Sequence, residues 1–188
     1  MNTINIFILH EDPVEAAVMM CNAHVVKMVT ESAQMLSTAH RVLDGEKTRR
    51  PSKSGKTNPK YWILPDYRED VLMKACHVGH PCTQWIMQSD ANYRWLFKHY
   101  NALSCEYTYR YGKKHAAFHK NDIGLALAAT PTNLPLGKLT PFAKAMKHYP
   151  ECIVEDAVTS YRNYYLTAKK DFAKWTKREE PTWWSEAA

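Results

Sequence analysis

The chain has 188 residues, of which 45% are hydrophobic and 23% charged, so it can bury a core and is not of the disordered class. No apolar run reaches the length of a membrane-spanning helix, which argues against an integral helical membrane protein. The formal net charge of +6 favours polyanionic partners, but a charge of this size also simply aids solubility.

The five cysteines are dispersed along the chain, and no two of them form a CxxC pair. Free thiols are typical of proteins in a reducing compartment. The first residues have neither the basic start nor the long apolar stretch of a signal peptide. Together these features predict a cytoplasmic protein.

The N-terminal part of the chain predicts a short extended segment followed by helices. Residues 3–9, TINIFIL, are rich in β-branched and aromatic side chains, which favours the extended form. Asp12 and Pro13 suit an N-cap and a first helical turn, so we expect a short helix as far as Met20. Residues 21–43 lack Gly and Pro and repeat with the helical period, which predicts the long helix that organises the fold.

This long helix has one apolar face and one polar face. The polar face carries a single carboxylate, Glu31, among bases and amides spaced three or four residues apart. The pattern fits an ordinary solvated surface with Lys27 and Glu31 as an i,i+4 pair, and it fits a functional site equally well. The two faces consist of Val25, Met28, Val29, Ser32, Leu36, Ala39 and Leu43, and of His24, Lys27, Glu31, Gln34, Thr38 and Arg41.

Residues 44–60 combine six Lys or Arg side chains with Gly, Ser and Pro, and this composition predicts a basic flexible linker loop. Two interpretations remain open. The segment is either a solvated surface loop or an arm whose cations, Arg49 and Arg50 among them, bind DNA phosphates without sequence preference.

The rest of the chain predicts further helices over residues 66–75, 81–89, 91–111, 116–128, 141–147 and 155–177, the last as a helical pair. Gly112 suits the end of the 91–111 helix, and Lys113, Lys114 and His115 follow where the helix dipole favours cations. Residues 178–188 form an aromatic tail. The fold class is therefore mostly α, a single-domain helical bundle over residues 1–188 with one short N-terminal extended segment.

Metal and cofactor motifs give little support for a bound group. Cys76, His77, His80 and Cys82 lie within seven residues, but structural zinc sites usually use two separated pairs of ligands. We predict no metal and keep a zinc protein as an alternative. Neither a P-loop nor a GxGxxG or GxSxG motif occurs, so no cofactor is expected.

The α-amino group of Met1 is a candidate nucleophile. Its ordinary pKa of about 7.7–8.0 leaves part of it unprotonated at neutral pH, unlike a lysine. Such an amine can attack a carbon centre or form a Schiff base when the fold holds it near a carboxylate. An extended N-terminus that leads to the helix bearing Glu31 could bring the two groups together.

Three stretches resemble the pyrimidine-dimer DNA glycosylase family, the small helical endonuclease V-like repair enzymes of phages and bacteria. They are HVVKMVTESAQML from His24, GHPCTQW over residues 79–85 and CEYTYRYGKKHA over residues 105–116. The resemblance implies that the N-terminal amine attacks C1′ of the damaged nucleotide and that Glu31 assists. It places His24, Lys27, His80, Trp85 and Arg110 at the DNA, where Arg49, Arg50, Lys113, Lys114 and His115 would hold phosphates.

The chain departs from the family pattern at several positions. Asn2 follows Met1, so the amine would be displaced by one residue if Met1 is retained. Thr30 and Gln34 occupy the neighbourhood of the arginine pair that flanks the family glutamate. The 44–60 segment and the C-terminal extension are additions.

We therefore predict a DNA glycosylase-like enzyme that acts on damaged or modified pyrimidines, with an abasic-site lyase step left open. DNA is the expected partner, and the base would have to be extruded from the duplex. The alternative is a non-enzymatic phage protein that binds nucleic acid or inhibits a host enzyme, since charge and aromatic content suit it equally. For a phage-encoded chain the expected location is the host-cell cytoplasm.

Overall fold

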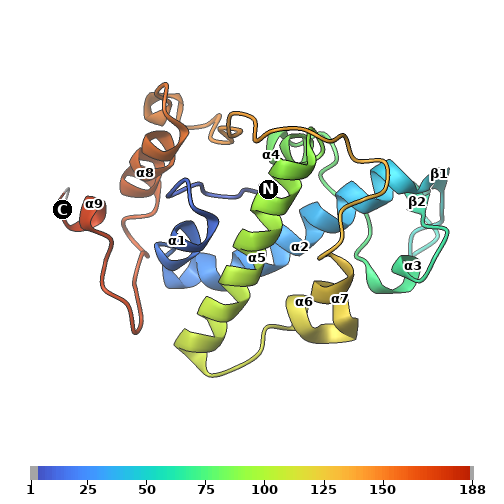
Figure 1. The fold of residues 1–188 in the computed structure, drawn as a ribbon, viewed down its shortest axis with the longest axis horizontal. Coiled ribbons are helices and arrows are strands. Elements are labelled where there is room, and N and C mark those ends of the chain that lie inside the picture. Colours follow the sequence, from blue (N-terminus) through green and yellow to red (C-terminus); the bar gives the residue numbers. More distant parts are fainter. Residues whose placement is uncertain (1–3, 187–188) are drawn as a thin grey trace.

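The computed structural model describes residues 4–186 and is mostly helical, as the sequence predicts. The two long helices cross near the middle of the molecule, and the shorter elements pack around them (Figure 1). The elements are α1 (Pro13–Val18), α2 (Asn22–Asp44), β1 (Glu46–Arg49), β2 (Lys60–Ile63), α3 (Arg68–Val71), α4 (Pro81–Ile86), α5 (Asp90–Tyr111), α6 (Ala116–His119), η1 (Lys120–Asp122), α7 (Ile123–Ala126), η2 (Pro150–Cys152), α8 (Ala157–Ala168) and α9 (Thr182–Ser185).

The described N-terminal segment over residues 4–9 is buried but has no regular secondary structure, and it pairs with no strand in the described part of the chain. Its backbone departs from the predicted extended form at Phe7, where φ is 56°. It leads into α1, whose N-cap is Asp12 as predicted. The Asp12 carboxylate accepts hydrogen bonds from the backbone N–H groups of Val14 and Glu15 at 2.8 and 3.0 Å. Such a cap satisfies donors that the first helical turn leaves unpaired.

Helix α2 is covered on both faces, and this explains why its polar side chains are mostly inaccessible. Its apolar face packs on α5, where Tyr93, Leu96 and Tyr100 are completely buried. The other side is covered by α4, α6 and the strand pair. The polar side chains of a helix in this position lie in buried hydrogen-bond networks or line pockets, and they do not form an open solvated surface.

Gly112 ends α5 in the left-handed conformation, with φ of 66°, as its sequence position predicts. A Cβ atom at this position would meet no neighbouring atom within 4 Å, so a substitution there is opposed by backbone strain alone. We expect Gly112→Ala to lower the free energy of unfolding by about 1–2 kcal/mol in urea denaturation. Gly79→Ala is the matched control, because Gly79 is equally open but its φ is not left-handed. Equal losses in the two variants would contradict this account.

The segment predicted as a flexible linker loop instead contains regular structure at its ends. β1 pairs with β2 in antiparallel register, with Glu46 opposite Ile63 and Thr48 opposite Tyr61. Cations of the hairpin also lie over aromatic rings, with Arg50 at 4.1 Å from the centroid of the Tyr61 ring. Composition alone missed the strand because β1 has few apolar residues, and its order comes from backbone pairing and these cation–π contacts.

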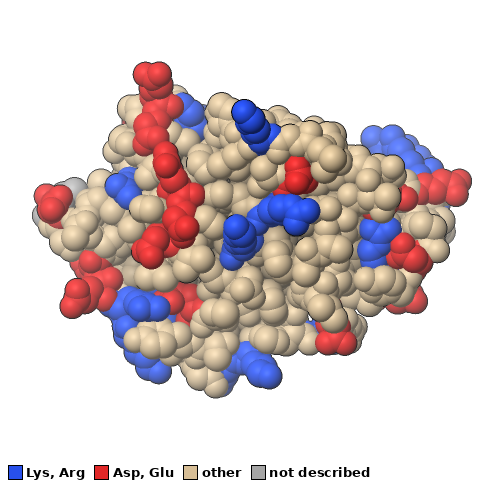
Figure 2. Space-filling model, in the orientation of Figure 1, with Lys and Arg blue, Asp and Glu red and all other residues tan. Residues whose placement is uncertain are grey.

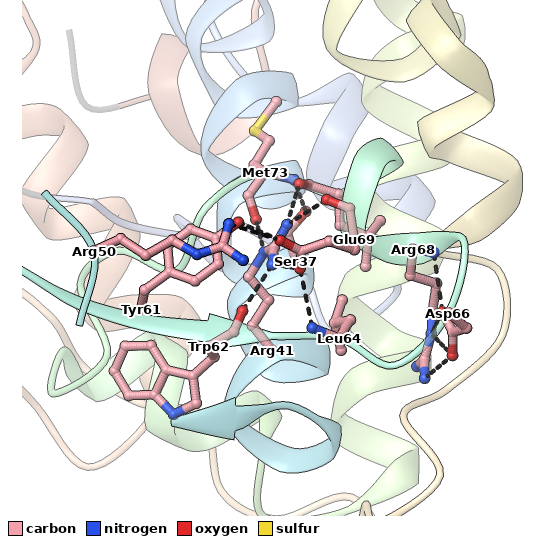
Figure 3. A network of polar contacts seen from close by, with 11 residues as sticks. Ser37, Arg41, Arg50, Tyr61, Trp62, Leu64, Asp66, Arg68, Glu69 and Met73 are labelled. Atoms are coloured by element: carbon pink, nitrogen blue, oxygen red, sulfur yellow. Dashed lines mark hydrogen bonds and ion pairs between the residues drawn. The ribbon is translucent and has the colours of Figure 1, made fainter. Parts of the chain in front are cut away.

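Arg41 of α2 joins the hairpin to the rest of the molecule (Figure 3). Its side chain is 1% exposed and donates to the backbone carbonyls of Trp62, Glu69, Leu72 and Met73. It also forms an ion pair with the Glu69 carboxylate at 2.6 Å. The Nε, Nη1 and Nη2 atoms of the guanidinium group therefore all donate hydrogen bonds to this segment, as its planar arrangement of N–H groups allows.

Glu69 is the acidic centre of the same network. Burial alone would raise the pKa of Glu69, but hydrogen bonds from the Tyr61 hydroxyl, the Leu64 N–H and Arg41 lower it to about 2. The carboxylate therefore remains charged well below neutral pH and continues to hold Arg41.

Beyond α2, the chain is less helical than predicted in several segments. The helix expected over 66–75 is reduced to α3, and the helix expected over 116–128 is interrupted where Asn121 and Asp122 have φ values of 54° and 55°. Residues 141–147 form no helix, and α8 stops at Ala168 instead of continuing toward residue 177. Tertiary contacts set the conformation of these segments, because their local helix propensity is weak.

No helix among residues 4–186 is long and apolar enough to cross a membrane. On the face drawn in Figure 2, basic and acidic side chains are interspersed, and no continuous basic surface covers its described part.

Candidate active site

Glu31 lies on the covered side of α2 and is 7% exposed. One carboxylate oxygen forms an ion pair with Lys27 Nζ at 3.0 Å, one helical turn earlier. The other oxygen accepts a hydrogen bond from the backbone N–H of Asn5, also at 3.0 Å. The lone carboxylate of the predicted polar face is therefore held in a defined position between a lysine and the N-terminal segment.

A hollow of about 430 Å³ opens at Glu31 and Lys27. Ile4 and Val26 supply its apolar wall, and the remaining lining residues are polar: Thr30, Gln34, His77 and His115. A carboxylate in such a position can stabilise positive charge or exchange a proton with a group that enters the hollow.

Asn5 connects this hollow to the C-terminal part of the chain. Its side-chain Nδ2 donates to the carbonyl of Ala145 at 2.9 Å, and its Oδ1 accepts from the hydroxyl of Tyr161 at 3.0 Å. The same residue that binds Glu31 through its backbone thus fixes the N-terminal segment against residues of the C-terminal extension. Met1, the second predicted catalytic residue, lies outside the described residues.

His24 has a different environment from the one predicted for a phosphate contact. Its ring stacks on Phe7 with centroids 4.3 Å apart, and its Nδ1 is hydrogen-bonded to the hydroxyl of Tyr165. Burial, followed by the charges of Lys169 and Lys27, lowers the pKa of His24 to about 3. The imidazole is therefore neutral at physiological pH and offers no positive charge to DNA.

Trp85 and Arg110, two predicted DNA contacts, are structural residues instead. Trp85 is 2% exposed and packs edge-on against Trp95 in the core. Arg110 is equally buried, forms an ion pair with Glu106 at 2.6 Å and donates to the carbonyl of Val18. Their spacing in the sequence could not reveal this, because both residue types serve cores and interfaces alike.

The remaining predicted DNA contacts fall into two groups. Arg49 and Arg50 lie on or beside β1, where Arg49 bonds the carbonyl of Asn58 and Arg50 pairs with Glu69 at 3.3 Å. Lys113 and Lys114 are exposed beyond the end of α5. The structure does not bring these two groups into one cluster with Glu31, although His115 shares its hollow.

The cysteine and histidine run over residues 76–82 forms a turn and a helix start. His80 is the N-cap of α4 and accepts from the backbone N–H of Cys82. Burial raises the pKa of the Cys82 thiol to about 12, so this side chain is a poor metal ligand. Among residues 4–186, no three His, Cys, Asp or Glu side chains lie close enough together to hold a metal ion.

Sequence reasoning missed Asn5, Phe7, Tyr164 and Lys169, which surround the approach to Lys27. Asn5 and Phe7 lie in a segment assigned only as extended, and the φ of 56° at Phe7 is unusual for an aromatic residue. Tyr164 and Lys169 lie far along the chain, where helical periodicity gives no sign of the partner. Only their aromatic and basic character could have drawn attention to them.

The fold and this site together define a small, mostly helical protein with a buried carboxylate beside its N-terminal segment. A family model described as pyrimidine dimer DNA glycosylase matches residues 1–119, more than half of the chain. The chain belongs to the pyrimidine dimer DNA glycosylase family, as its motifs indicate. Neither a curated protein nor a solved structure matches it.

Proposed function

We propose that the chain is a DNA N-glycosylase that releases damaged or modified pyrimidines, with its N-terminal amine as nucleophile and Glu31 assisting. The observation that carries the proposal is the hydrogen bond from the Asn5 N–H to Glu31. It puts the carboxylate directly beside the N-terminal segment. Membership of the glycosylase family supplies the reaction class.

The distance from the described chain to the amine is bounded by covalent geometry. Met1 is three residues before Ile4, and an extended chain spans at most about 3.6 Å per residue, or about 11 Å here. Ile4 itself lines the hollow at Glu31. An amine on this tether is therefore able to reach a sugar bound over the carboxylate.

The chemistry requires three bonds to change at C1′. The amine lone pair forms a bond to C1′ while the glycosidic bond breaks, its electron pair leaves on the base, and the base takes up a proton from water. The attached amine loses a proton, its lone pair forms the C=N bond of a protonated imine, and the C1′–O4′ bond breaks with its electron pair going to O4′, which takes up a proton. The negative charge of Glu31 stabilises the positive charge that develops at the sugar, and its carboxylate accepts the proton of the amine.

We infer that polar and cationic side chains near Glu31 hold the DNA during this reaction. Lys27 offers a positive charge at the carboxylate itself, and His80, whose pKa is lowered by burial, lies on the neighbouring pocket wall as a hydrogen-bonding group. Arg49, Arg50, Lys113, Lys114 and His115 would contact phosphates farther along the duplex. Such contacts add affinity and position the duplex but do not select the base.

The direct test is cleavage of a glycosidic bond in short duplexes that contain one cyclobutane pyrimidine dimer, compared with undamaged duplexes of the same sequence. We expect a broken glycosidic bond only in the damaged duplex, detected by chromatography and by strand scission with alkali. Binding of both duplexes without any broken bond would contradict the proposal and would favour a non-enzymatic nucleic-acid-binding protein.

A further inference from the structure

A second and larger pocket adjoins the hollow at Glu31 through Lys27, which lines both. We call it the C-terminal pocket, because residues 144–149, Tyr164 and Lys169 form one of its walls. Asn5, Phe7, the first turns of α2 and residues 79–81 complete its lining. Its volume of about 490 Å³ falls within the range of about 300–1,000 Å³ typical of small-ligand sites.

The pocket owes its cationic character to lysines. Its described lining includes four lysines and no carboxylate, while burial lowers the pKa of His24 and His80, two of its three histidines. Lys144 is engaged by the carbonyls of Val154 and Glu155, and Lys27 is paired with Glu31. Neither Lys147 nor Lys169 forms an ion pair with a described carboxylate, and Lys169 donates to the Tyr164 hydroxyl at 3.3 Å, so both ammonium groups keep N–H donors for an anion.

The pocket also has an aromatic wall. Phe7 and Tyr164 lie nearly parallel, with ring centroids 5.9 Å apart, and Tyr149 lies 5.0 Å from Tyr164 at an angle. Lys169 Nζ sits 4.5 Å above the Tyr164 ring, which joins the aromatic and cationic parts. Phe7, which belongs to this wall, is buried and has a positive φ. Backbone strain of this kind persists where the surrounding structure enforces it.

The aromatic rings can stack on a base, and the lysines that lack a carboxylate partner can bind a phosphate. Together they match the two parts of a nucleotide. We propose that the C-terminal pocket binds one nucleotide unit extruded from DNA, with the base against Tyr149 and Tyr164 and the phosphate at Lys147 and Lys169. The inference rests on the proposed function for the identity of the polymer. It assigns substrate selection to residues 144–169, which lie outside the matched region of residues 1–119.

The first experiment measures binding of the free mononucleotide dTMP to the full chain by NMR titration, with thymidine and inorganic phosphate as separate probes. We expect dTMP to bind more tightly than either part alone. In the double variant Lys147→Gln/Lys169→Gln its dissociation constant should rise at least tenfold. The control Lys170→Gln/Lys174→Gln removes two exposed charges nearby that do not line the pocket, and it should leave binding unchanged.

The second experiment separates this inference from the proposed function. The double variant should lower kcat/KM for glycosidic bond cleavage in dimer-containing duplex at least tenfold, while the control variant retains it. Normal glycosidic cleavage by the double variant would overturn the inference and leave the glycosylase proposal standing. The wild-type chain could also bind dTMP through these lysines and yet cleave no glycosidic bond. That result would exclude DNA as the source of the bound nucleotide and identify a free nucleotide as the ligand.

Discussion

Replacing Glu31 with Gln is expected to lower the single-turnover rate of base release by about 10²–10⁴-fold. The amide removes the negative charge that stabilises the developing cation at C1′ and removes the proton acceptor for the amine. It keeps the size of the side chain and an oxygen that can still accept the Asn5 N–H bond now made at 3.0 Å. The fold should therefore persist, and rapid-quench measurement of released base reports the chemical step.

Two comparisons make this result specific. Glu11→Gln removes one negative charge at an exposed position and should leave the rate within about twofold of the wild type. Thermal unfolding of Glu31→Gln should show a folded protein with a single transition. A rate for Glu31→Gln equal to that of the wild type would remove Glu31 from the mechanism.

Replacing Arg41 with Met is expected to lower the free energy of unfolding by about 3–5 kcal/mol. The substitution keeps the apolar stem but removes the guanidinium, which leaves four backbone carbonyls without this donor and the Glu69 carboxylate without its ion-pair partner at 2.6 Å. Buried acceptors that lose their partner carry the full desolvation penalty. Urea denaturation followed by circular dichroism measures the loss.

Arg94→Met is the matched control for this prediction. Arg94 pairs with Asp90 at 3.4 Å, but its side chain is 60% exposed, and exposed pairs contribute about 1 kcal/mol or less. We expect its stability to remain within about 0.5 kcal/mol of the wild type. A similar small loss for Arg41→Met would mean that the strand pair and α3 are held by other contacts.

Local sequence patterns predicted the elements whose ends carry strong local signals. Asp12 caps α1, and Gly112 ends α5, because an N-cap acceptor and a left-handed glycine act within one turn of the helix. The long helix over residues 21–43 appears as α2 with nearly the predicted bounds. The same patterns failed for residues 141–147, where Thr140 and Pro141 suggested a helix start that the structure lacks, and for the end of α8.

Only the central residue of the candidate site could be predicted from the sequence. The single carboxylate on a polar helical face marked Glu31, and that residue proves to be buried and bonded to the N-terminal segment. Periodicity cannot show which elements cover a face, so it could not place Trp85 and Arg110 in the core. For the same reason, periodicity could not show that Lys169 and Lys27 line the same pocket, because the two residues are 142 positions apart in the sequence.

If the N-terminal amine and Glu31 act on the same sugar, borohydride reduction should trap the chain covalently on abasic-site DNA. We expect an adduct on the α-nitrogen of the first residue, located by peptide mass spectrometry, that forms more slowly in Glu31→Gln. An adduct on a lysine side chain, or no adduct while glycosidic cleavage continues, would exclude the N-terminal amine as the nucleophile.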